Sequence, residues 1–282
     1  MDNRPIGVFD SGLGGLTVVR QLIRELPGEE IIYFGDTGRV PYGTRSPETI
    51  EKYTRQDCNF LLKKDVKLII AACGTVSSVA PHVLNTLPVP ALGVVEPAAK
   101  AAATATQNGI VGVIGTCATI NSGSFFKSIQ KFRPLTQVVE QACPLFVPLV
   151  ENGWIDENDE VTCLTARRYL LPVLNKGIDT LLLGCTHFPL LKPIISKTLG
   201  QNVTLIDPGQ IAAKKCAQML AENDMLCHKS GNGSLRFYIS DRTEDFARVA
   251  GMFLGRNVNG DVRTINIENI DMPDECGAGH NN

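Results

Sequence analysis

The chain has 282 residues, of which 44% are hydrophobic, and it carries a formal net charge of −2. A chain of this length can bury a sizeable core in one or two domains. The slightly acidic balance is unlike the basic surface of a nucleic-acid-binding protein, and no apolar run reaches the roughly 20 residues of a membrane-spanning helix. Nine scattered cysteines without C-x-x-C spacing favour a soluble protein in the reducing cytoplasm.

Short apolar runs alternate with helical periodicity from the start of the chain. A strand at 6–9 precedes the glycine-rich turn 10–15 and a helix at 16–26, in which Leu16, Val19 and Leu22 share one face. Further strands are predicted at 31–34, 66–72 and 91–95, with a helix from 46 to 64. Short runs bounded by turn residues are typical of buried parallel strands, so this part predicts an α/β unit.

The same alternation begins again at residue 110. Strands are predicted at 110–115, 138–139, 180–183 and 203–206, and a helix at 159–176, in which Pro172 predicts a kink or break. After a helix at 211–220, strands at 235–239 and 262–267 flank a helix at 243–254 and are expected to return to the first unit.

This repeated pattern predicts an α/β fold of two similar three-layer domains, whose mostly parallel sheets face each other across an active-site cleft. We expect residues 1–95 and 207–270 to form the first domain and residues 96–206 to form the second. The polar tail 271–282 is expected to be disordered.

Two cysteines stand at matching places in this pattern. Cys73 ends one apolar strand and Cys185 ends another, each is followed within two residues by threonine, and each precedes a helix N-terminus, which lowers a thiol pKa. Open α/β sheets bind ligands at the carboxyl ends of their strands. Two thiols in opposite protonation states can exchange a proton on either face of a carbon acid and so invert a stereocentre.

Other polar residues are expected on the same rim. Asp10, Glu151 and His187 stand at strand ends or in loops, where they would tune the thiols. The glycines of the turn 10–15 expose backbone N–H groups that suit a carboxylate. The expected hydroxyl donors are those of Ser11, Thr75, Thr116, Thr119 and Thr186.

Alternative sites fit less well. The turn 10–15 imitates a dinucleotide fingerprint, which keeps a nucleotide-binding regulatory module as an alternative, but Thr17 replaces the third glycine. No metal site is expected, because Cys185 and His187 supply only two ligands together. Arg39 is expected to be a solvated loop residue.

Long motifs carry a family resemblance. They are Gly7-Val8-Phe9-Asp10-Ser11-Gly12-Leu13-Gly14-Gly15-Leu16-Thr17, Gly35-Asp36-Thr37, Pro41-Tyr42-Gly43, Pro144-Leu145-Phe146-Val147-Pro148-Leu149-Val150-Glu151 and Leu183-Gly184-Cys185-Thr186-His187. With these motifs in this order, the chain resembles the glutamate racemases over residues 6–209. The resemblance implies a homodimeric, cofactor-independent enzyme with its site between two α/β domains, supplying D-glutamate for peptidoglycan.

The resemblance also implies roles for individual residues. Cys73 would act on D-glutamate with the help of Asp10, and Cys185 would act on L-glutamate with the support of His187 and Glu151. The substrate-binding residues would be Asp10, Ser11, Tyr42, Gly43, Gly74, Thr75, Thr116, Thr119, Thr186 and His187.

One position departs from the family pattern. The family usually has asparagine between Cys73 and Thr75, where this chain has Gly74. A missing amide contact costs on the order of 1 kcal/mol, so Gly74→Asn is expected to tighten glutamate binding. The departure keeps aspartate racemase, or a broader amino-acid racemase, as an alternative.

Overall fold

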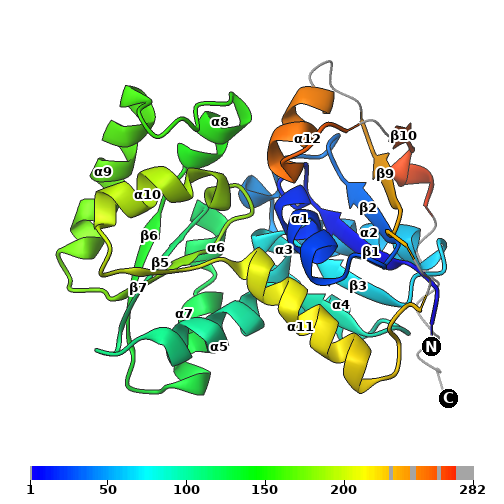
Figure 1. The fold of residues 1–282 in the computed structure, drawn as a ribbon, viewed down its shortest axis with the longest axis horizontal. Helices are drawn as coiled ribbons and strands as arrows, with labels where there is room; N and C mark the ends of the chain where they lie inside the picture. Colours follow the sequence, from blue (N-terminus) through cyan, green and yellow to red (C-terminus); the bar gives the residue numbers. More distant parts are fainter. Residues whose placement is uncertain (1, 229–230, 242–245, 259–261, 271–282) are drawn as a thin grey trace, which may run out of the picture.

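Two parallel sheets, each with helices on both faces, organise the computed structural model, which describes residues 2–228, 231–241, 246–258 and 262–270 (Figure 1). The strands are β1 (Ile6–Asp10), β2 (Ile31–Gly35), β3 (Leu68–Ala71), β4 (Ala91–Gly93), β5 (Ile110–Gly115), β6 (Gln137–Ala142), β7 (Thr180–Leu183), β8 (Thr204–Ile206), β9 (Leu235–Ile239) and β10 (Val262–Thr264). The α-helices are α1 (Leu16–Glu25), α2 (Pro47–Leu62), α3 (Gly74–Val79), α4 (Pro81–Leu84), α5 (Val95–Ala105), α6 (Cys117–Asn121), α7 (Ser124–Phe132), α8 (Phe146–Glu151), α9 (Glu160–Leu174), α10 (Lys192–Leu199), α11 (Pro208–Glu222) and α12 (Phe246–Leu254). Short 3₁₀ helices are η1 (Tyr42–Thr44), η2 (Phe188–Leu191) and η3 (Ile267–Asn269).

The two sheets repeat one topology. The first has the order β10-β9-β2-β1-β3-β4 and the second has the order β6-β5-β7-β8, with every strand pair parallel. The run β2-β1-β3-β4 therefore matches β6-β5-β7-β8 strand for strand. The prediction of two similar α/β units is confirmed, and the sheets are entirely parallel among the described residues.

The central strands of each sheet are buried on both faces. In β2, Ile31 and Tyr33 belong to one hydrophobic cluster while Ile32 and Phe34 belong to another, because successive side chains point to opposite faces. Leu182 in β7 lies in a different cluster from its neighbours Leu181 and Leu183. Continuous apolar runs such as Thr180–Leu183 thus form strands covered by helices on both sides.

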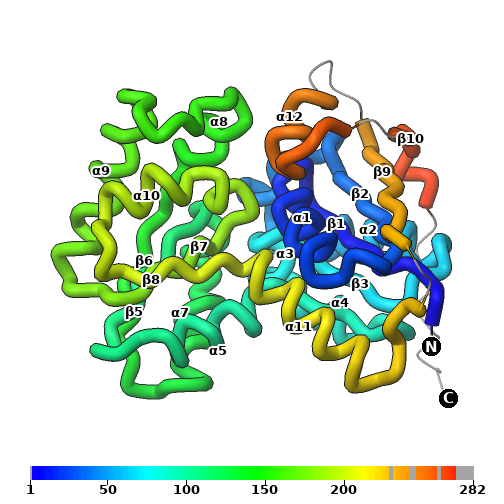
Figure 2. Tube along the Cα trace, in the orientation of Figure 1, coloured from blue at the N-terminus to red at the C-terminus, as the bar shows by residue number. Residues whose placement is uncertain are grey.

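We call the six-stranded sheet with α1–α4 and α12 the first lobe, and the four-stranded sheet with α5–α10 the second lobe. The chain passes from the first lobe to the second after β4 and leaves the second after β8 (Figure 2). Helix α11 then packs against both α1 and α5. Strands β9 and β10 return to the first sheet, as expected. The domain boundaries at 95/96 and 206/207 fall at the start of α5 and before α11, and that division stays a proposal.

A few local predictions differ from the structure. The strand predicted at 91–95 ends at Gly93, because Val95 already begins α5. Helix α9 continues through Pro172 without the predicted break, and only Val173 and Leu174 follow the proline in the helix. The strand predicted at 262–267 ends at Thr264 and is followed by η3. The tail 271–282 lies outside the described residues. Among the described residues, no helix combines the length and apolarity needed to cross a membrane.

Candidate active site

Each sheet places one cysteine beside its topological switch point. The order of the strands reverses between β1 and β3 in the first sheet and between β5 and β7 in the second. Cys73 follows β3 and Cys185 follows β7, each two residues beyond the last residue of its strand. Parallel α/β sheets bind their ligands at this crevice. The topology therefore gives both cysteines equivalent positions in the two lobes.

The two strand-end edges lie against each other. Three glycines of the first lobe each approach the second lobe: Gly14 lies against Thr186, Gly43 against Thr116 and Gly74 against Gly184. A Cβ atom on Gly74 would lie 2.7 Å from the carbonyl oxygen of Gly184, which is too close for any real side chain. The hydroxyl of Thr17 also reaches across, 3.0 Å from the carbonyl oxygen of Thr186. Thr17 is not among the site residues expected from the sequence, although it lies in the long first motif.

A small cavity lies beside this contact. It is lined by Gly74 and Cys185 among others and measures about 10 Å³. Such a volume corresponds to about one water molecule. This cavity is therefore too small to hold an amino acid.

Asp10 ends β1 as a buried carboxylic group with one unpartnered oxygen. Its Oδ2 accepts a hydrogen bond of 3.1 Å from the N–H of Gly12, while Oδ1 has no hydrogen-bond partner among the described residues. Burial raises the pKa of Asp10, and the positive charge of His187 and the backbone N–H groups of Gly15 and Gly12 oppose that rise. The Oδ1 atom of Asp10 is therefore available to form a hydrogen bond with a ligand that enters the site.

Cys73 caps α3 but is not activated by it. Its Sγ donates a 3.4 Å hydrogen bond to the hydroxyl of Ser11. Burial and the nearby Asp10 carboxylate together raise the pKa of Cys73 to about 12. The sequence predicted that the helix would lower the pKa of Cys73, and this prediction is wrong. Helix α3 has only six residues, and the thiol is removed from water. Cys73 is a neutral thiol here.

Cys185 lies next to a charged histidine. The Nδ1 atom of His187 is 3.8 Å from the Cys185 Sγ, and its Nε2 atom is 3.0 Å from Glu151 Oε1. Burial opposes protonation of the ring, but the hydrogen bonds with Cys185 and Glu151 outweigh it and raise the pKa of His187 to about 10. The ring of Phe253 in α12 packs edge-on against the His187 ring, with the two ring centroids 4.9 Å apart. Cys185 therefore lies beside a positive charge, whereas Cys73 is a neutral thiol.

The charge on His187 makes stability depend on pH. The pKa of its folded form, about 10, lies above the ordinary value of 6.5. The pairing therefore stabilises the folded chain fully below pH 6.5, and the contribution is lost as the pH rises towards 10. Thermal unfolding of wild type and His187→Gln should show the largest difference below pH 6.5 and convergence near pH 10. The exposed pair His82–Glu51, tested with His82→Gln, is the control, because solvent screens it. A difference independent of pH would contradict this prediction.

Hydroxyl groups of threonines lie around the two cysteines. Thr116 caps α6, accepting a hydrogen bond from the N–H of Thr119 at 3.2 Å, and its hydroxyl donates to that of Thr119 at 3.0 Å. Thr186 Oγ1 is 3.4 Å from Nδ1 of His187. Thr75 is buried in the first turn of α3. These positions agree with strand-end donors for a small anion.

Tyr42 and Arg39 differ from what the sequence indicated. The Tyr42 side chain is 1% exposed, and its hydroxyl turns away from the second lobe towards Asp36 and Asp57. Its neighbour Gly43 is the residue that lies against Thr116. Arg39 is not solvated but 8% exposed, in the same buried group. The expectation of a solvated arginine is wrong, because side chains from α2 and η3 join Asp36 around it, and a local pattern does not reveal that approach.

Among the described residues, no cluster of three or more His, Cys, Asp and Glu side chains could hold a metal ion. The arrangement instead offers a thiol and a second, histidine-paired sulfur on facing lobes. Close to one or the other sulfur lie a buried carboxyl group, hydroxyls and the N-terminus of a short helix. Such groups can move protons and hold a small carboxylate.

Known proteins are similar to this chain in sequence and fold. The family model described as Asp/Glu/Hydantoin racemase matches residues 6–216. The glutamate racemase of Geobacter metallireducens is 47% identical over 266 residues, 94% of this chain and 97% of that protein. The glutamate racemase of Neisseria meningitidis serogroup A is 49% identical over 257 residues, 90% of this chain and 94% of that protein.

A solved structure agrees with these relatives. The glutamate racemase of Francisella tularensis, crystallised in complex with D-glutamate, superposes with a TM-score of 0.88 at 40% identity, covering 95% of this chain and 99% of that one. The family model matches residues 6–216, and the similarities in sequence and fold extend over nearly the whole chain. The chain therefore belongs to the Asp/Glu/Hydantoin racemase family.

Proposed function

We propose that this chain racemises glutamate by two-base proton transfer at Cα, with Cys73 and Cys185 as the two bases. The observation that carries the proposal is the placement of one cysteine at each switch point of two facing lobes. The relatives with the highest identities described above are glutamate racemases, which favours glutamate as the substrate.

The neutral thiol of Cys73 suggests which direction of the reaction this structure is ready to begin. With L-glutamate bound, the Cys185 thiolate removes the Cα proton and leaves its electron pair on the carbanion. The Cys73 thiol then donates its proton to the opposite face, forming D-glutamate. Cys73 is left as a thiolate and Cys185 as a thiol, and the reverse reaction restores the first state.

The remaining side chains have supporting roles in this proposal. Asp10 assists Cys73, and the pair formed by His187 and Glu151 supports Cys185, consistent with the 3.8 Å and 3.0 Å contacts of the ring. The substrate would be held by Ser11, Gly43, Gly74, Thr75, Thr116, Thr119 and Thr186, with a backbone contact only at Tyr42. Because Gly14, Gly43 and Gly74 bring the lobes into contact, the substrate would enter when the lobes move apart.

From the family resemblance we further propose that the protein forms a homodimer, that it acts in the cytoplasm and that its product D-glutamate is used for peptidoglycan. Sedimentation of the purified protein tests the first of them, and a monomer at micromolar concentration would remove the dimer from the proposal.

The proposed function is tested by incubating the protein with L-glutamate in deuterated water. Deuterium should appear at Cα, and D-glutamate should accumulate. The same assay with D- and L-aspartate and other amino acids distinguishes a glutamate racemase from a broader racemase by the ratio of kcat/KM. Absence of exchange with every acidic amino acid would reject the proposal. Titration with NAD or ATP tests the nucleotide-binding alternative, for which we expect no binding.

The absence of a side chain at Gly74 is expected to affect the contact between the lobes more than the missing asparagine amide affects substrate binding. Gly74→Ala and Gly74→Asn both introduce the Cβ that would lie 2.7 Å from the carbonyl oxygen of Gly184. This contact opposes the expectation that asparagine tightens binding, because the lobes must first separate. We expect both variants to raise KM for glutamate, with asparagine the less affected by about 1 kcal/mol if its amide contacts substrate.

The comparison of these two variants separates the two effects, because they share the same Cβ. Initial rates measured over a range of glutamate concentrations give KM and kcat for each. A KM for Gly74→Ala equal to that of the wild type would show that the lobes do not need the close approach.

A further inference from the structure

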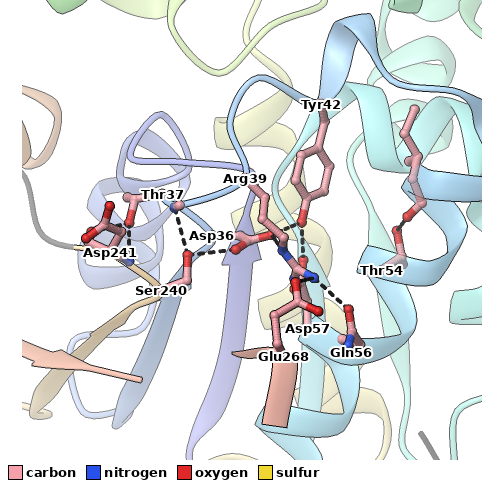
Figure 3. Close-up of polar contacts among 12 residues, drawn as sticks. Asp36, Thr37, Arg39, Tyr42, Thr54, Gln56, Asp57, Ser240, Asp241 and Glu268 are labelled. Atoms are coloured by element: carbon pink, nitrogen blue, oxygen red, sulfur yellow. Dashed lines mark hydrogen bonds and ion pairs between the residues drawn. The ribbon is translucent and has the colours of Figure 1, made fainter. Parts of the chain in front are cut away.

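Arg39 is the centre of a buried polar network in the first lobe (Figure 3). Its guanidinium donates to Asp36 Oδ2 at 2.5 Å, Gln56 Oε1 at 2.6 Å and Asp57 Oδ1 at 3.0 Å. The ring of Tyr53 lies 3.9 Å from the guanidinium carbon. Arg39 therefore joins the loop after β2 to helix α2 through bonds that are shielded from water.

The C-terminal part of the first lobe joins the same network. The hydroxyl of Ser240, just after β9, donates to Asp36 Oδ1 at 2.7 Å and accepts from the N–H of Gly38 at 2.8 Å. Glu268 in η3 contributes Oε1 at 3.4 Å from Arg39. The segment 36–39 is thus held by residues that lie about 200 positions further along the chain.

The contacts of the Tyr42 hydroxyl show how many hydrogen atoms this part of the network needs. Its hydroxyl oxygen contacts two carboxyl groups, Asp36 at Oδ2 and Asp57 at Oδ2, and the second distance is 3.0 Å. A phenol has one hydrogen to donate, so two such contacts need a second hydrogen from a carboxyl group. Asp36 already accepts from Arg39, Tyr42 and Ser240, which suits a carboxylate. Asp57 is therefore the group that carries the second hydrogen.

The charges around Asp57 support this assignment. Both aspartates are fully buried, and one guanidinium balances one carboxylate. Burial and the neighbouring Asp36 raise the pKa of Asp57 well above its ordinary value, while Arg39 opposes the rise and Asp10 adds to it. Tyr42 donates to Asp36, and Glu268, which is mostly exposed, faces the network through Arg39. A neutral Asp57 leaves no uncompensated charge in the core.

The network holds the segment that faces the second lobe. Tyr42 begins η1, and the next residue, Gly43, lies with its Cβ position 3.7 Å from the hydroxyl oxygen of Thr116. The η1 turn also contacts α3, which carries Cys73 at its N-terminus, and α6 of the second lobe. A side chain that fixes Tyr42 therefore fixes the backbone of Gly43 at the meeting point of the lobes.

We infer that Arg39 and a protonated Asp57, bridged to Asp36 by the Tyr42 hydroxyl, are positioning residues that hold the 41–43 segment at the substrate site. The order of donation is Asp57 to Tyr42 to Asp36. This inference rests on the proposed function only for its effect on substrate binding.

The proton on Asp57 is tested by infrared spectroscopy. The difference spectrum between wild type and Asp57→Asn should contain the carbonyl stretch of one protonated carboxyl group, shifted in deuterated water. Asparagine reproduces the shape and the hydrogen-bonding pattern of the protonated side chain. Hydrogen exchange of the peptide 38–45, followed by mass spectrometry, should therefore be unchanged in Asp57→Asn. A missing carboxyl band, or loss of protection in Asp57→Asn as large as in Asp57→Ala, would overturn the assignment.

The positioning role is tested with Arg39→Gln and with Tyr42→Phe, in case the first variant folds poorly. Each should speed amide exchange in the peptide 38–45 relative to the rest of the chain. Each should also raise KM for both enantiomers of glutamate by about tenfold with a smaller change in kcat, because loosened binding acts on ground and transition states alike. Arg55→Gln is the matched control: Arg55 lies on α2 but pairs at the surface with Glu51.

The outcomes separate the inference from the proposed function. An unchanged exchange rate for the peptide 38–45 in both Arg39→Gln and Tyr42→Phe would overturn the positioning role. The same holds if KM stays at its wild-type value while only the unfolding temperature falls. If the wild type itself racemises no amino acid, the proposed function fails, and the infrared and exchange measurements still decide the inference.

Discussion

Replacing either Cys73 or Cys185 with serine is expected to lower kcat for glutamate racemisation by about 10²–10⁴-fold, the contribution of a positioned acid or base. A serine hydroxyl loses its proton far less readily than a thiol, so each variant lacks one of the two bases. Circular dichroism and thermal unfolding should show a preserved fold, because the change is nearly isosteric. Rates of racemisation followed by polarimetry provide the measurement.

Exchange with solvent sharpens this test. In each variant the remaining cysteine can still remove the Cα proton of the one enantiomer whose hydrogen faces it. Cys73→Ser should therefore exchange the hydrogen of L-glutamate, and Cys185→Ser that of D-glutamate, without net inversion. Cys163→Ser, on helix α9, is the matched control and should racemise normally. Near-normal racemisation by both site variants would show that the two thiols are not the bases.

Lys67→Met is expected to lower the free energy of unfolding by about 3–5 kcal/mol, the cost of breaking a buried ion pair. The side chains of Lys67 and Glu29 are 0% and 3% exposed, with Nζ 2.6 Å from Glu29 Oε2. The same Nζ donates to the carbonyl oxygens of Asp2 at 2.8 Å and Met225 at 2.7 Å. Methionine leaves the carboxylate buried without a counter-charge. Urea denaturation measures the loss.

An exposed pair of nearly equal length provides the control. Lys131 and Glu96 are 2.7 Å apart but 67% and 62% exposed, so Lys131→Met should cost at most about 1 kcal/mol. The double variant Lys67→Met/Glu29→Gln should recover part of the loss, because the uncompensated charge is then absent. Equal losses for Lys67→Met and Lys131→Met would refute the role given to burial.

Much of the fold could be predicted because it follows from local pattern. The spacing of Leu16, Val19 and Leu22 depends only on neighbours in the sequence, and it predicted helix α1 to within one residue of its end. The continuous apolar run Thr180–Leu183 likewise predicts a strand inside a sheet that is covered on both faces. The repeat of strand and helix then predicted two similar units, since parallel strands need helical crossovers.

The ingredients of the candidate site could also be found from the sequence. Cys73 and Cys185 each end a predicted strand, and strand ends are where such sheets bind ligands. Asp10, Glu151 and His187 are expected at strand ends or in loops on the same rim. In the structure, His187 does contact Cys185 and Glu151, and Asp10 lies close enough to Cys73 to raise its pKa. What these residues do chemically stays a proposal.

The chain by itself determined the elements, their order and which reactive side chains stand at strand ends, because those properties depend on residues a few positions apart. Only the tertiary structure decided that Arg39 is buried, that Cys73 is a neutral thiol and that Gly74 meets the backbone of Gly184. Each of these depends on loss of water and on atoms brought together from distant segments, Ser240 and Glu268 among them. The burial of a group and the charges that act on it depend on all the atoms around it in the folded chain, and a local sequence pattern does not contain that information.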